Sequence, residues 1–321
     1  MNFDDYLNRG QAHLEKREID AALKDFSKAI ELEPKNIVAY VMRGELYRES
    51  GECDAAIKDF DEAIRLDSGD FHAYLGRGET YLEQEECEKA IADLDEVIRL
   101  DSSIPIAYFS RGEAYLKMEN YDNAIADFSE AIKLEPSFNL AYINRGEAYQ
   151  DLEDYDKAIA DFSKAIEIDP EDPFAYFCRG EVCLEQGNHD KAIADFNTAI
   201  DLDQGVSAAY VSRGTIYAEL GENDKAIADY NTAINLDPDI PITYVSRGTL
   251  YADQGENDKA IADFDKAIEL EPNNPLAFIG RGQVHGKSGQ KEKAIADLEK
   301  ALELESNLDW VREELQEIRG K

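Results

Sequence analysis

The sequence predicts an all-α protein, a solenoid of tandem helical hairpins, and three observations support this fold class. The dipeptide Arg-Gly recurs at a constant interval of 34 residues from Arg9-Gly10 to Arg281-Gly282. Between these dipeptides, each interval holds two stretches whose apolar residues return at helical spacing. Many intervals also close with a proline, which a helix cannot continue through. A fixed period of this length indicates a repeat array rather than a set of globular domains.

Placing the first repeat at Phe3 divides the chain into nine repeats and a short tail. In the fifth repeat, residues 139–149 open a first helix (helix A) and residues 155–166 form a second (helix B). Ala158, Ile159 and Phe162 lie on one apolar face of that second helix, and Pro170 closes the unit. The predicted repeats are 3–36, 37–70, 71–104, 105–138, 139–172, 173–206, 207–240, 241–274 and 275–308, followed by a C-terminal capping helix at 309–321.

Small and aromatic residues stand at fixed points of the unit, and small residues let the two helices approach closely. In the fifth repeat, these points hold Tyr142, Gly146, Tyr149, Ala158, Phe162, Ala165 and Pro170. At these positions the chain resembles the tetratricopeptide repeat family, and the resemblance extends over essentially its whole length. It departs from that family's commonest pattern by placing Arg, as bacterial arrays do, where Leu usually precedes the Gly. The resemblance implies a right-handed superhelix whose first helices line a concave groove for peptides or partner helices.

The repeated arginine requires a partner, because an unpaired guanidinium on a helix face that packs inward is costly. Each repeat also carries one aspartate at a fixed place on its second helix. We expect Arg–Asp pairs, within repeats or between neighbours, that fix the hairpin geometry. The alternative is an anion-binding track of arginines. The aspartates are Asp25, Asp59, Asp93, Asp127, Asp161, Asp195, Asp229, Asp263 and Asp297.

Both ends of the array have features that suit a helix without a neighbour. Asp5 replaces the alanine that later repeats carry at a position expected to press on the preceding unit. After the ninth repeat, Val311, Leu315 and Ile318 continue an apolar stripe, which predicts a capping helix. We expect Trp310, the single tryptophan, to cover the end of that packing.

Composition limits the classes of partner. The net charge of −36, from 34 basic against 70 acidic residues, repels nucleic acid and anionic membrane surfaces and favours cationic partners. Acidity also keeps a solenoid soluble, and that role alone is the alternative explanation. No apolar stretch approaches the roughly 18 residues of a membrane span, and the N-terminus lacks the pattern of a signal peptide. We therefore expect a cytoplasmic protein that binds no membrane.

The sequence offers no catalytic or metal-binding set. The cysteines contain no CxxC pair and have no histidine at ligand spacing, so we expect free thiols, no metal and no cofactor. The histidines are scattered over four repeats, without a shared nucleophile or carboxylate, and an enzyme is not expected. The residues concerned are Cys53, Cys87, Cys178, Cys183, His13, His72, His189 and His285.

Comparing the first helices across repeats predicts what the groove offers. One position gives glutamates in the second to sixth repeats and then Thr215, Thr249 and Gln283, so a neutral stretch follows an acidic one. Two further positions are mainly apolar. This combination favours a cationic, partly hydrophobic segment, although glutamates on a solvated helix face and aromatics in packing are the plainer alternatives. The predicted groove residues are Glu45, Glu79, Glu113, Glu147, Glu181, Leu75, Phe109, Ile143, Phe177 and Leu116.

The predicted function is therefore a noncatalytic protein-interaction scaffold or adaptor. The members of the family that hold acidic chaperone C-terminal tails use a lysine where this chain has Leu7, Val41 or Leu75, so such tails are not expected partners. The alternative function is a self-assembling structural array whose acidity serves only solubility.

Overall fold

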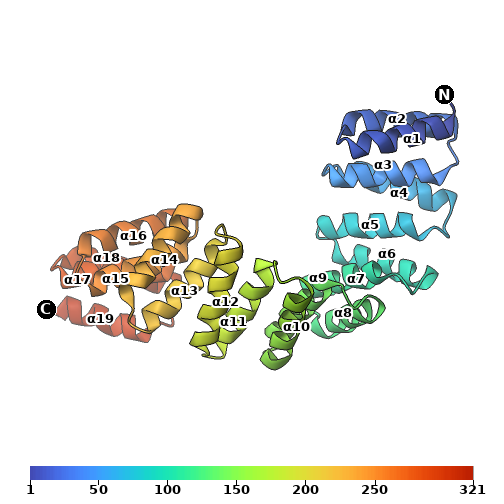
Figure 1. The fold of residues 1–321 in the computed structure, drawn as a ribbon. Helices are drawn as coiled ribbons and strands as arrows, with labels where there is room; N and C mark the ends of the chain where they lie inside the picture. Colours follow the sequence, from blue (N-terminus) through green and yellow to red (C-terminus); the bar gives the residue numbers. More distant parts are fainter. Residues whose placement is uncertain (321) are drawn as a thin grey trace. The chain divides into compact units, whose positions relative to one another are not determined.

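The computed structural model describes residues 1–320, which form nineteen α-helices and no strand (Figure 1). The predicted all-α fold of successive helix pairs is confirmed. The chain divides into two compact units, an N-terminal unit of residues 1–169 and a C-terminal unit that begins at Pro170. The N-terminal unit holds α1 (Phe3–Glu15), α2 (Ile19–Leu32), α3 (Ile37–Glu49), α4 (Cys53–Leu66), α5 (Phe71–Glu83), α6 (Cys87–Leu100), α7 (Pro105–Lys117), α8 (Tyr121–Leu134), α9 (Asn139–Asp151) and α10 (Tyr155–Ile168). The C-terminal unit holds α11 (Pro173–Glu185), α12 (His189–Leu202), α13 (Ser207–Glu219), α14 (Asn223–Leu236), α15 (Pro241–Asp253), α16 (Asn257–Leu270), α17 (Pro275–Lys287), α18 (Lys291–Leu304) and α19 (Asp309–Gly320).

Each hairpin is held together by a large side chain of helix B against a glycine of helix A. Phe162 is fully buried on α10, between the equally buried Ala158 and Ala165. A Cβ atom added to Gly146 on α9 would lie 2.8 Å from Cε1 of the Phe162 ring, closer than real contacts allow. Helix A therefore needs a residue without a side chain at this point, which is the Gly of the repeated Arg-Gly dipeptide.

The turns between helix A and helix B place one residue in the left-handed region of backbone space. In the C-terminal unit this residue is always glycine, at Gly187, Gly221, Gly255 and Gly289, with φ between 71° and 76°. In the N-terminal unit only Gly51 fills the position with glycine, and four side-chain-bearing residues take the same conformation elsewhere: Arg17, Glu85, Glu119 and Glu153. Those four positions carry backbone strain that glycine would relieve.

The predicted Arg–Asp pairs are present in all nine repeats. Each guanidinium donates from Nε and Nη2 to the two carboxylate oxygens of the aspartate sixteen residues later, and the Nε–Oδ2 distances are 2.6–2.9 Å. The aspartates are at most 7 % exposed. Because the carboxylates already occupy these guanidinium faces, the arginines do not form an anion-binding track.

The same arginines also link neighbouring hairpins through Nη1. Arg43 donates to Ser27 Oγ at 2.9 Å, and Arg247 donates to Asn231 Oδ1 at 2.6 Å. Arg77 instead reaches a second carboxylate, that of Asp61. A single planar side chain thus joins helix A and helix B of its own repeat to helix B of the preceding one.

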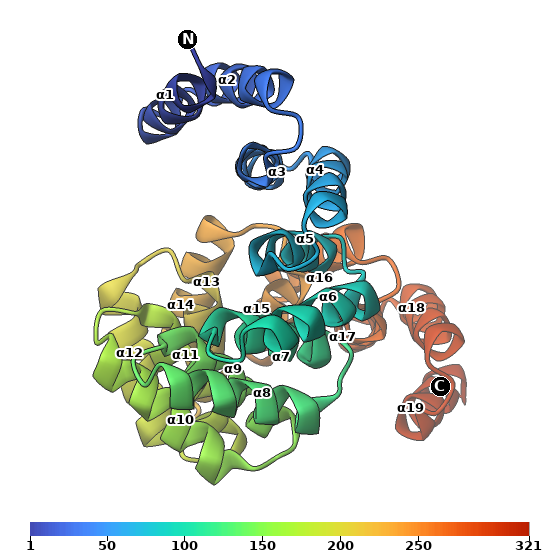
Figure 2. The same ribbon diagram turned by 90° about the vertical axis from the view of Figure 1, so that its right-hand side faces the viewer.

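The two ends of the helical array are capped in different ways. At the N-terminus, Asn2 and Asp5 form a reciprocal capping box, each backbone N–H donating to the other side chain at 2.8 Å. At the other end, α19 lies next to α18 (Figure 2). Val311 and Leu315 of α19 are buried in one apolar cluster with side chains of α17 and α18. The prediction for Trp310 is wrong, because its side chain is 50 % exposed and lies outside that cluster.

Candidate interaction site

The first helices of the N-terminal unit present a row of glutamates, which we call the glutamate row. Its members are half-buried and stand one repeat apart on α3, α5, α7 and α9. On each helix, the residue three or four positions earlier is apolar, so carboxylates and apolar side chains share one helix face. The glutamate row consists of Glu45, Glu79, Glu113 and Glu147.

A pocket of about 340 Å³ opens on this face between α5 and α7. Its apolar part comes from Leu82, Ile106 and Phe109, of which Leu82 and Phe109 are nearly buried. Glu79 and Glu113 provide two of the carboxylates at its wall. The pocket therefore brings together three of the residues that the sequence predicts, Glu79, Phe109 and Glu113. The remaining lining residues are Arg48, Glu83, Ser110 and Lys117.

Arg48 already occupies one end of the glutamate row. Its Nη2 lies 2.9 Å from Glu45 Oε2 and 3.2 Å from Glu79 Oε2, and its Nη1 lies 2.8 Å from Glu83 Oε1. The side chain is only 21 % exposed, so a guanidinium is accommodated between carboxylates from two successive first helices. Glu113 has Lys117 as its neighbouring cation, one turn later on α7.

The electrostatics change along the glutamate row. Burial raises the pKa of Glu79, although the charge of Arg48 opposes the shift. Burial also raises the pKa of Glu113, with Lys117 opposing, and that of Glu147, where the neighbouring Asp151 adds repulsion. At Glu147, burial and the neighbouring negative charge therefore act on the pKa in the same direction, whereas a cation opposes burial at Glu79 and Glu113.

The predicted apolar groove residues differ in what they expose. Ile143 is 1 % exposed and belongs to the hairpin core, which leaves it no surface for a partner. Phe109 is 6 % exposed and packs against Phe128 and Phe138, with ring centroids 5.8 and 4.8 Å away. Leu75 and Leu116 are half-buried. Phe109 thus serves both packing and the pocket.

The remaining two predicted residues, Phe177 and Glu181, lie on α11 in the C-terminal unit. Phe177 is half-buried and its ring stands 5.9 Å from Phe196. Burial raises the pKa of Glu181, which also has a side-chain hydrogen bond with Ser212, while its Oε1 is buried without a hydrogen-bond partner. Further along, Thr215 and Thr249 replace the glutamate and donate to backbone carbonyls of their own helices at 3.0 and 2.9 Å.

Sequence reasoning missed Arg48, Lys117 and Ile106. A signal for Arg48 was available, because it stands where later repeats carry Leu82 and Leu116. Ile106 belongs to a second overlooked series. The second residue of helix A is apolar in most repeats, and its exposed members include Val38, Leu140, Phe174, Ile242 and Leu276.

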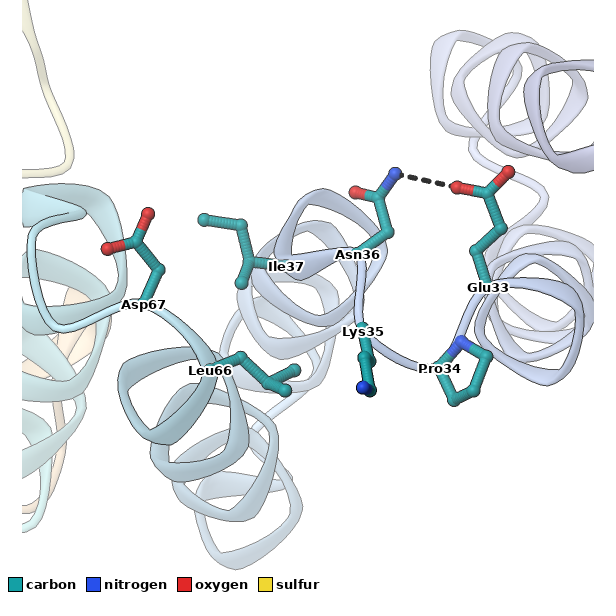
Figure 3. A pocket seen from close by; sticks show the side chains of 7 residues that line it. All are labelled: Glu33, Pro34, Lys35, Asn36, Ile37, Leu66 and Asp67. Carbon is teal, nitrogen blue, oxygen red and sulfur yellow. Dashed lines mark hydrogen bonds between the residues drawn. The ribbon is translucent and has the colours of Figure 1, made fainter.

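A larger hollow of about 730 Å³ lies at the loop between α2 and α3 (Figure 3). There Asn36 Nδ2 donates to Glu33 at 3.0 Å, while Asn36 Oδ1 accepts from the Val38 N–H at 3.2 Å and caps α3. The other lining residues are Pro34, Lys35, Ile37, Leu66 and Asp67. The Asn36 amide is therefore occupied by hydrogen bonds within the loop. None of the predicted groove residues lines this hollow.

The described part of the chain contains no group of three or more His, Cys, Asp or Glu side chains placed to hold a metal ion. Its helices are also all too short or too polar to span a lipid bilayer.

Comparison with known proteins covers almost the whole chain. Family models described as tetratricopeptide repeat match residues 4–36, 105–138, 140–172 and 173–205, residues 41–105, and residues 277–308; one described as TPR repeat matches 214–255 and 248–289. No curated protein matches the sequence.

Solved structures share the fold at low identity. The Cut9–Hcn1 hetero-tetramer of the APC/C matches with a TM-score of 0.62 and 14 % identity, covering 98 % of this chain and 75 % of that one. PilF of Pseudomonas aeruginosa matches with a TM-score of 0.61 and 17 % identity, covering 68 % and 98 %. A tetratricopeptide repeat protein from Parabacteroides merdae matches with a TM-score of 0.58 and 21 % identity, covering 78 % and 99 %.

Proposed function

Because the chain belongs to the tetratricopeptide repeat family, we propose that it is a noncatalytic scaffold or adaptor that binds a segment of a partner protein. The segment is cationic and partly hydrophobic, and it lies on the first helices of the N-terminal unit. The observation that carries the proposal is the pocket between α5 and α7, where an apolar floor adjoins the half-buried carboxylates of Glu79 and Glu113.

The pocket suits an apolar side chain with a basic neighbour. Leu82 and Phe109 offer an apolar floor, so an inserted aliphatic group would leave water. The glutamates have lost part of their hydration, as the raised pKa values of Glu113 and Glu147 indicate. A lysine or arginine of the partner would replace that lost solvation with an ion pair.

Arg48 supports this choice of partner chemistry. Its guanidinium bonds to Glu45, Glu79 and Glu83, which demonstrates that this face holds an arginine side chain in a partly buried position. At Glu147, burial and the charge of Asp151 both raise the pKa, so a partner's cation would stabilise the ionised carboxylate there.

The absence of a catalytic role and the cytoplasmic location are parts of the same proposal. His13 and His285 lie in different units, and their carboxylate neighbours include Asp25 and Asp297, which already pair with Arg9 and Arg281. Cys53, Cys87 and Cys183 are free thiols, as suits a reducing compartment.

Peptide binding tests the proposal directly. We would compare a short peptide of alternating leucine and lysine with its leucine–glutamate counterpart, at low and high salt. The variant carries Glu79→Gln, Glu113→Gln and Glu147→Gln, and the matched control carries Glu31→Gln, Glu88→Gln and Glu167→Gln, exposed positions on α2, α6 and α10. Both change the net charge equally. We expect only the first variant to bind the lysine peptide more weakly, by about threefold to a hundredfold, because it loses three ion pairs of about 0.2–1 kcal/mol each.

Equal binding by the two variants would remove the glutamate row from the site and leave acidity as a general property of the surface. Association of the protein with itself, seen as a mass that rises with concentration in light scattering, would instead support the self-assembling array.

The pH dependence of binding has a defined sign. Because burial raises the pKa of Glu113 and Glu147, these carboxylates become protonated at a higher pH than free glutamate. Affinity for the lysine peptide is therefore full above the raised pKa values and falls as the pH drops toward 4.5. Titration of affinity against pH checks this. The triple Gln variant should show a flatter profile, and an identical profile for both proteins would contradict the assignment.

A further inference from the structure

The ninth repeat has a histidine at a helix-A position where six other repeats place a tyrosine. This residue is His285 on α17. In four repeats a lysine of helix B lies over the tyrosine ring, and Lys259 Nζ, for example, is 4.9 Å from the centroid of Tyr251. Each of these lysines also pairs with a carboxylate three residues earlier, as Lys259 does with Glu256. The hairpin therefore accommodates an uncharged ring beneath a lysine whose charge is paired.

The ninth repeat keeps the lysine and loses both of these partners. Lys293 is equivalent to Lys259, but Gln290 replaces the acid and His285 replaces the ring. The imidazole is only 8 % exposed, and its Nδ1 is buried without a hydrogen-bond partner. Because an unsatisfied buried polar atom costs free energy, the hydrogen bonding of the hairpin does not explain why histidine stands here.

The charged groups around the imidazole do not compensate a positive charge on it. Arg281 on α17 and Lys293 on α18 are cations, and the carboxylates are Asp265 on α16 and Asp297 on α18. Asp297 lies 4.0 Å from His285 Nε2, but both of its oxygens already accept from Arg281. Asp265 also accepts from Arg281, through Nη1. Burial therefore lowers the pKa of His285 below its ordinary value of 6.5, and the two cations lower it further, while Asp297 opposes them.

His285 also lies beside the contact between α17 and the capping helix. A Cβ atom added to the next residue, Gly286, would touch Ile318 Cδ1 of α19 at 3.5 Å. Phe278 of α17 belongs to the same apolar cluster as Val311 of α19. His285 lines a pocket of about 330 Å³ between α16, α17 and α18, which gives water a route to the imidazole.

We propose that His285 makes the C-terminal end of the array a pH-dependent switch, in which protonation of the imidazole loosens the ninth hairpin and releases α19. Water that enters through the pocket then hydrates the new charge, for which the closed hairpin offers no free carboxylate. Release of α19 uncovers the buried apolar side chains of Phe278, Ile279 and Leu298. The surface that the array presents at this end therefore depends on pH.

The equivalent histidine of the first repeat provides an internal contrast. His13 Nδ1 lies 2.5 Å from Glu18 Oε2, and its Nε2 lies 3.6 Å from Asp25 Oδ2. Two carboxylates therefore meet a positive charge on that ring. We expect protonation of histidine to loosen the C-terminal end of the array and not the N-terminal end.

The direction of the pH effect follows from the lowered pKa. Because the folded repeat disfavours the charged imidazole, the unfolded repeat binds the proton more readily. The contribution of neutral His285 to stability is therefore complete above the ordinary histidine pKa of 6.5 and is lost as the pH falls below it.

Urea unfolding followed by the fluorescence of Trp310 tests the proposal, because the only tryptophan lies on α19. We would compare the whole chain with His285→Tyr, which restores the residue of six other repeats, and with the matched control His13→Tyr, from about pH 8 to about pH 5.5. We expect the midpoint to fall with pH in the whole chain and in His13→Tyr, and to fall less in His285→Tyr. The carboxylates are common to all three proteins, so the difference between the profiles reports His285.

A second measurement does not depend on the folding of His285→Tyr. The variant with His13→Asn, His72→Asn and His189→Asn keeps His285 as its only histidine. Proton NMR of that ring gives its pKa directly, and we expect a value below 6.5. Far-ultraviolet circular dichroism at about pH 8 verifies that each variant is folded.

Three results would overturn the proposal. The first is a parallel fall of the Trp310 midpoint in the whole chain and in folded His285→Tyr. The second is a His285 ring that titrates at or above 6.5. The third is acid unfolding in which circular dichroism and Trp310 fluorescence change together, because α19 would then leave only when the whole array unfolds. None of these results depends on peptide binding at the glutamate row, which lies in the other unit.

Discussion

The helix-A faces of the two units are built on the same framework and differ in charge. In the N-terminal unit, the glutamate row meets two cations, Arg48 and Lys117, around an apolar pocket. In the C-terminal unit, Glu181 still holds the glutamate position on α11, but Thr215 and Thr249 take it on α13 and α15 and donate their hydroxyls to the helix backbone. The Arg–Asp pairs are nevertheless the same in both units. The comparison shows that the Arg–Asp pairs stay constant while the residues at the glutamate position of helix A change between the two units.

Breaking the shared framework should have the largest effect, and a similar one in both units. Asp161→Ala leaves the guanidinium of Arg145 without its carboxylate, and Asp263→Ala does the same to Arg247. Because the arginines remain partly exposed, we expect each change to cost about 2–4 kcal/mol, somewhat less than for a fully buried pair. Urea unfolding measures both. A loss below about 1 kcal/mol in either unit, within the range of exposed ion pairs, would contradict a common structural role.

The close approach of the two helices should show next. Gly146→Ala places a Cβ atom 2.8 Å from the Phe162 ring, whereas Gly78→Ala meets Leu94 Cγ at 3.2 Å. We expect the first to destabilise by about 1–3 kcal/mol through overpacking. The second should be within about 0.5 kcal/mol of neutral, because the helix preference of alanine offsets a milder contact. Thermal unfolding of the pair separates them, and equal losses would show that the ring is not the cause.

Replacing Arg48 increases the difference in charge between the helix-A faces of the two units. Arg48→Leu restores the residue type of Leu82 and Leu116 and frees Glu45 and Glu79 from their internal cation. We expect affinity for the leucine–lysine peptide to rise about two- to fivefold, the worth of one exposed ion pair, and to become more sensitive to salt. Calorimetric titration at two salt concentrations is the measurement. Weaker binding would mean that Arg48 shapes the pocket rather than competing for it.

The turns between helices should give the smallest change in stability, and they differ in residue type between the two units. Glu119→Gly relieves a side-chain-bearing residue at φ 57°, where the C-terminal unit uses glycine throughout. We expect a gain of about 0.5–1 kcal/mol, because the relief of strain exceeds the entropy that glycine adds to the unfolded chain. Gly221→Glu is the reciprocal change and should lose a similar amount. A loss in Glu119→Gly would show that the glutamate side chain makes a compensating contact.

Much of the fold followed from periodicity, since the spacing of Arg, Gly and helix-B Asp is set by one hairpin. The pairing of Arg43 with Asp59 was therefore predictable. Its additional bond to Ser27 was not assigned in advance, because spacing alone does not separate contacts within a repeat from contacts with its neighbour. The structure shows that one arginine makes both.

The site was harder to predict from the sequence, because one helix face carries both residues that pack against neighbouring helices and residues that stay exposed. Ile143 and Phe109 occupy equivalent positions, yet only Phe109 lines the pocket. From the sequence, we expected Trp310 to cover the end of the packing of the capping helix, but its side chain is 50 % exposed. Ile242 and Leu276, at the equivalent position of α15 and α17, are exposed as well. Sequence alone does not show this, because the exposure of an apolar residue depends on which face its helix turns to its neighbours.

Hydrogen exchange of the whole chain, with and without the short leucine–lysine peptide, tests the central claim most directly. Binding on the first helices of the N-terminal unit should slow exchange in α5, α7 and α9 while α4, α6 and α8 stay unchanged. Protection confined to α15, α17 and α19 would place the peptide on the C-terminal unit and would contradict the claim. Protection confined to α4, α6 and α8, or a lysine peptide that binds without slowing α5, α7 or α9, would contradict it.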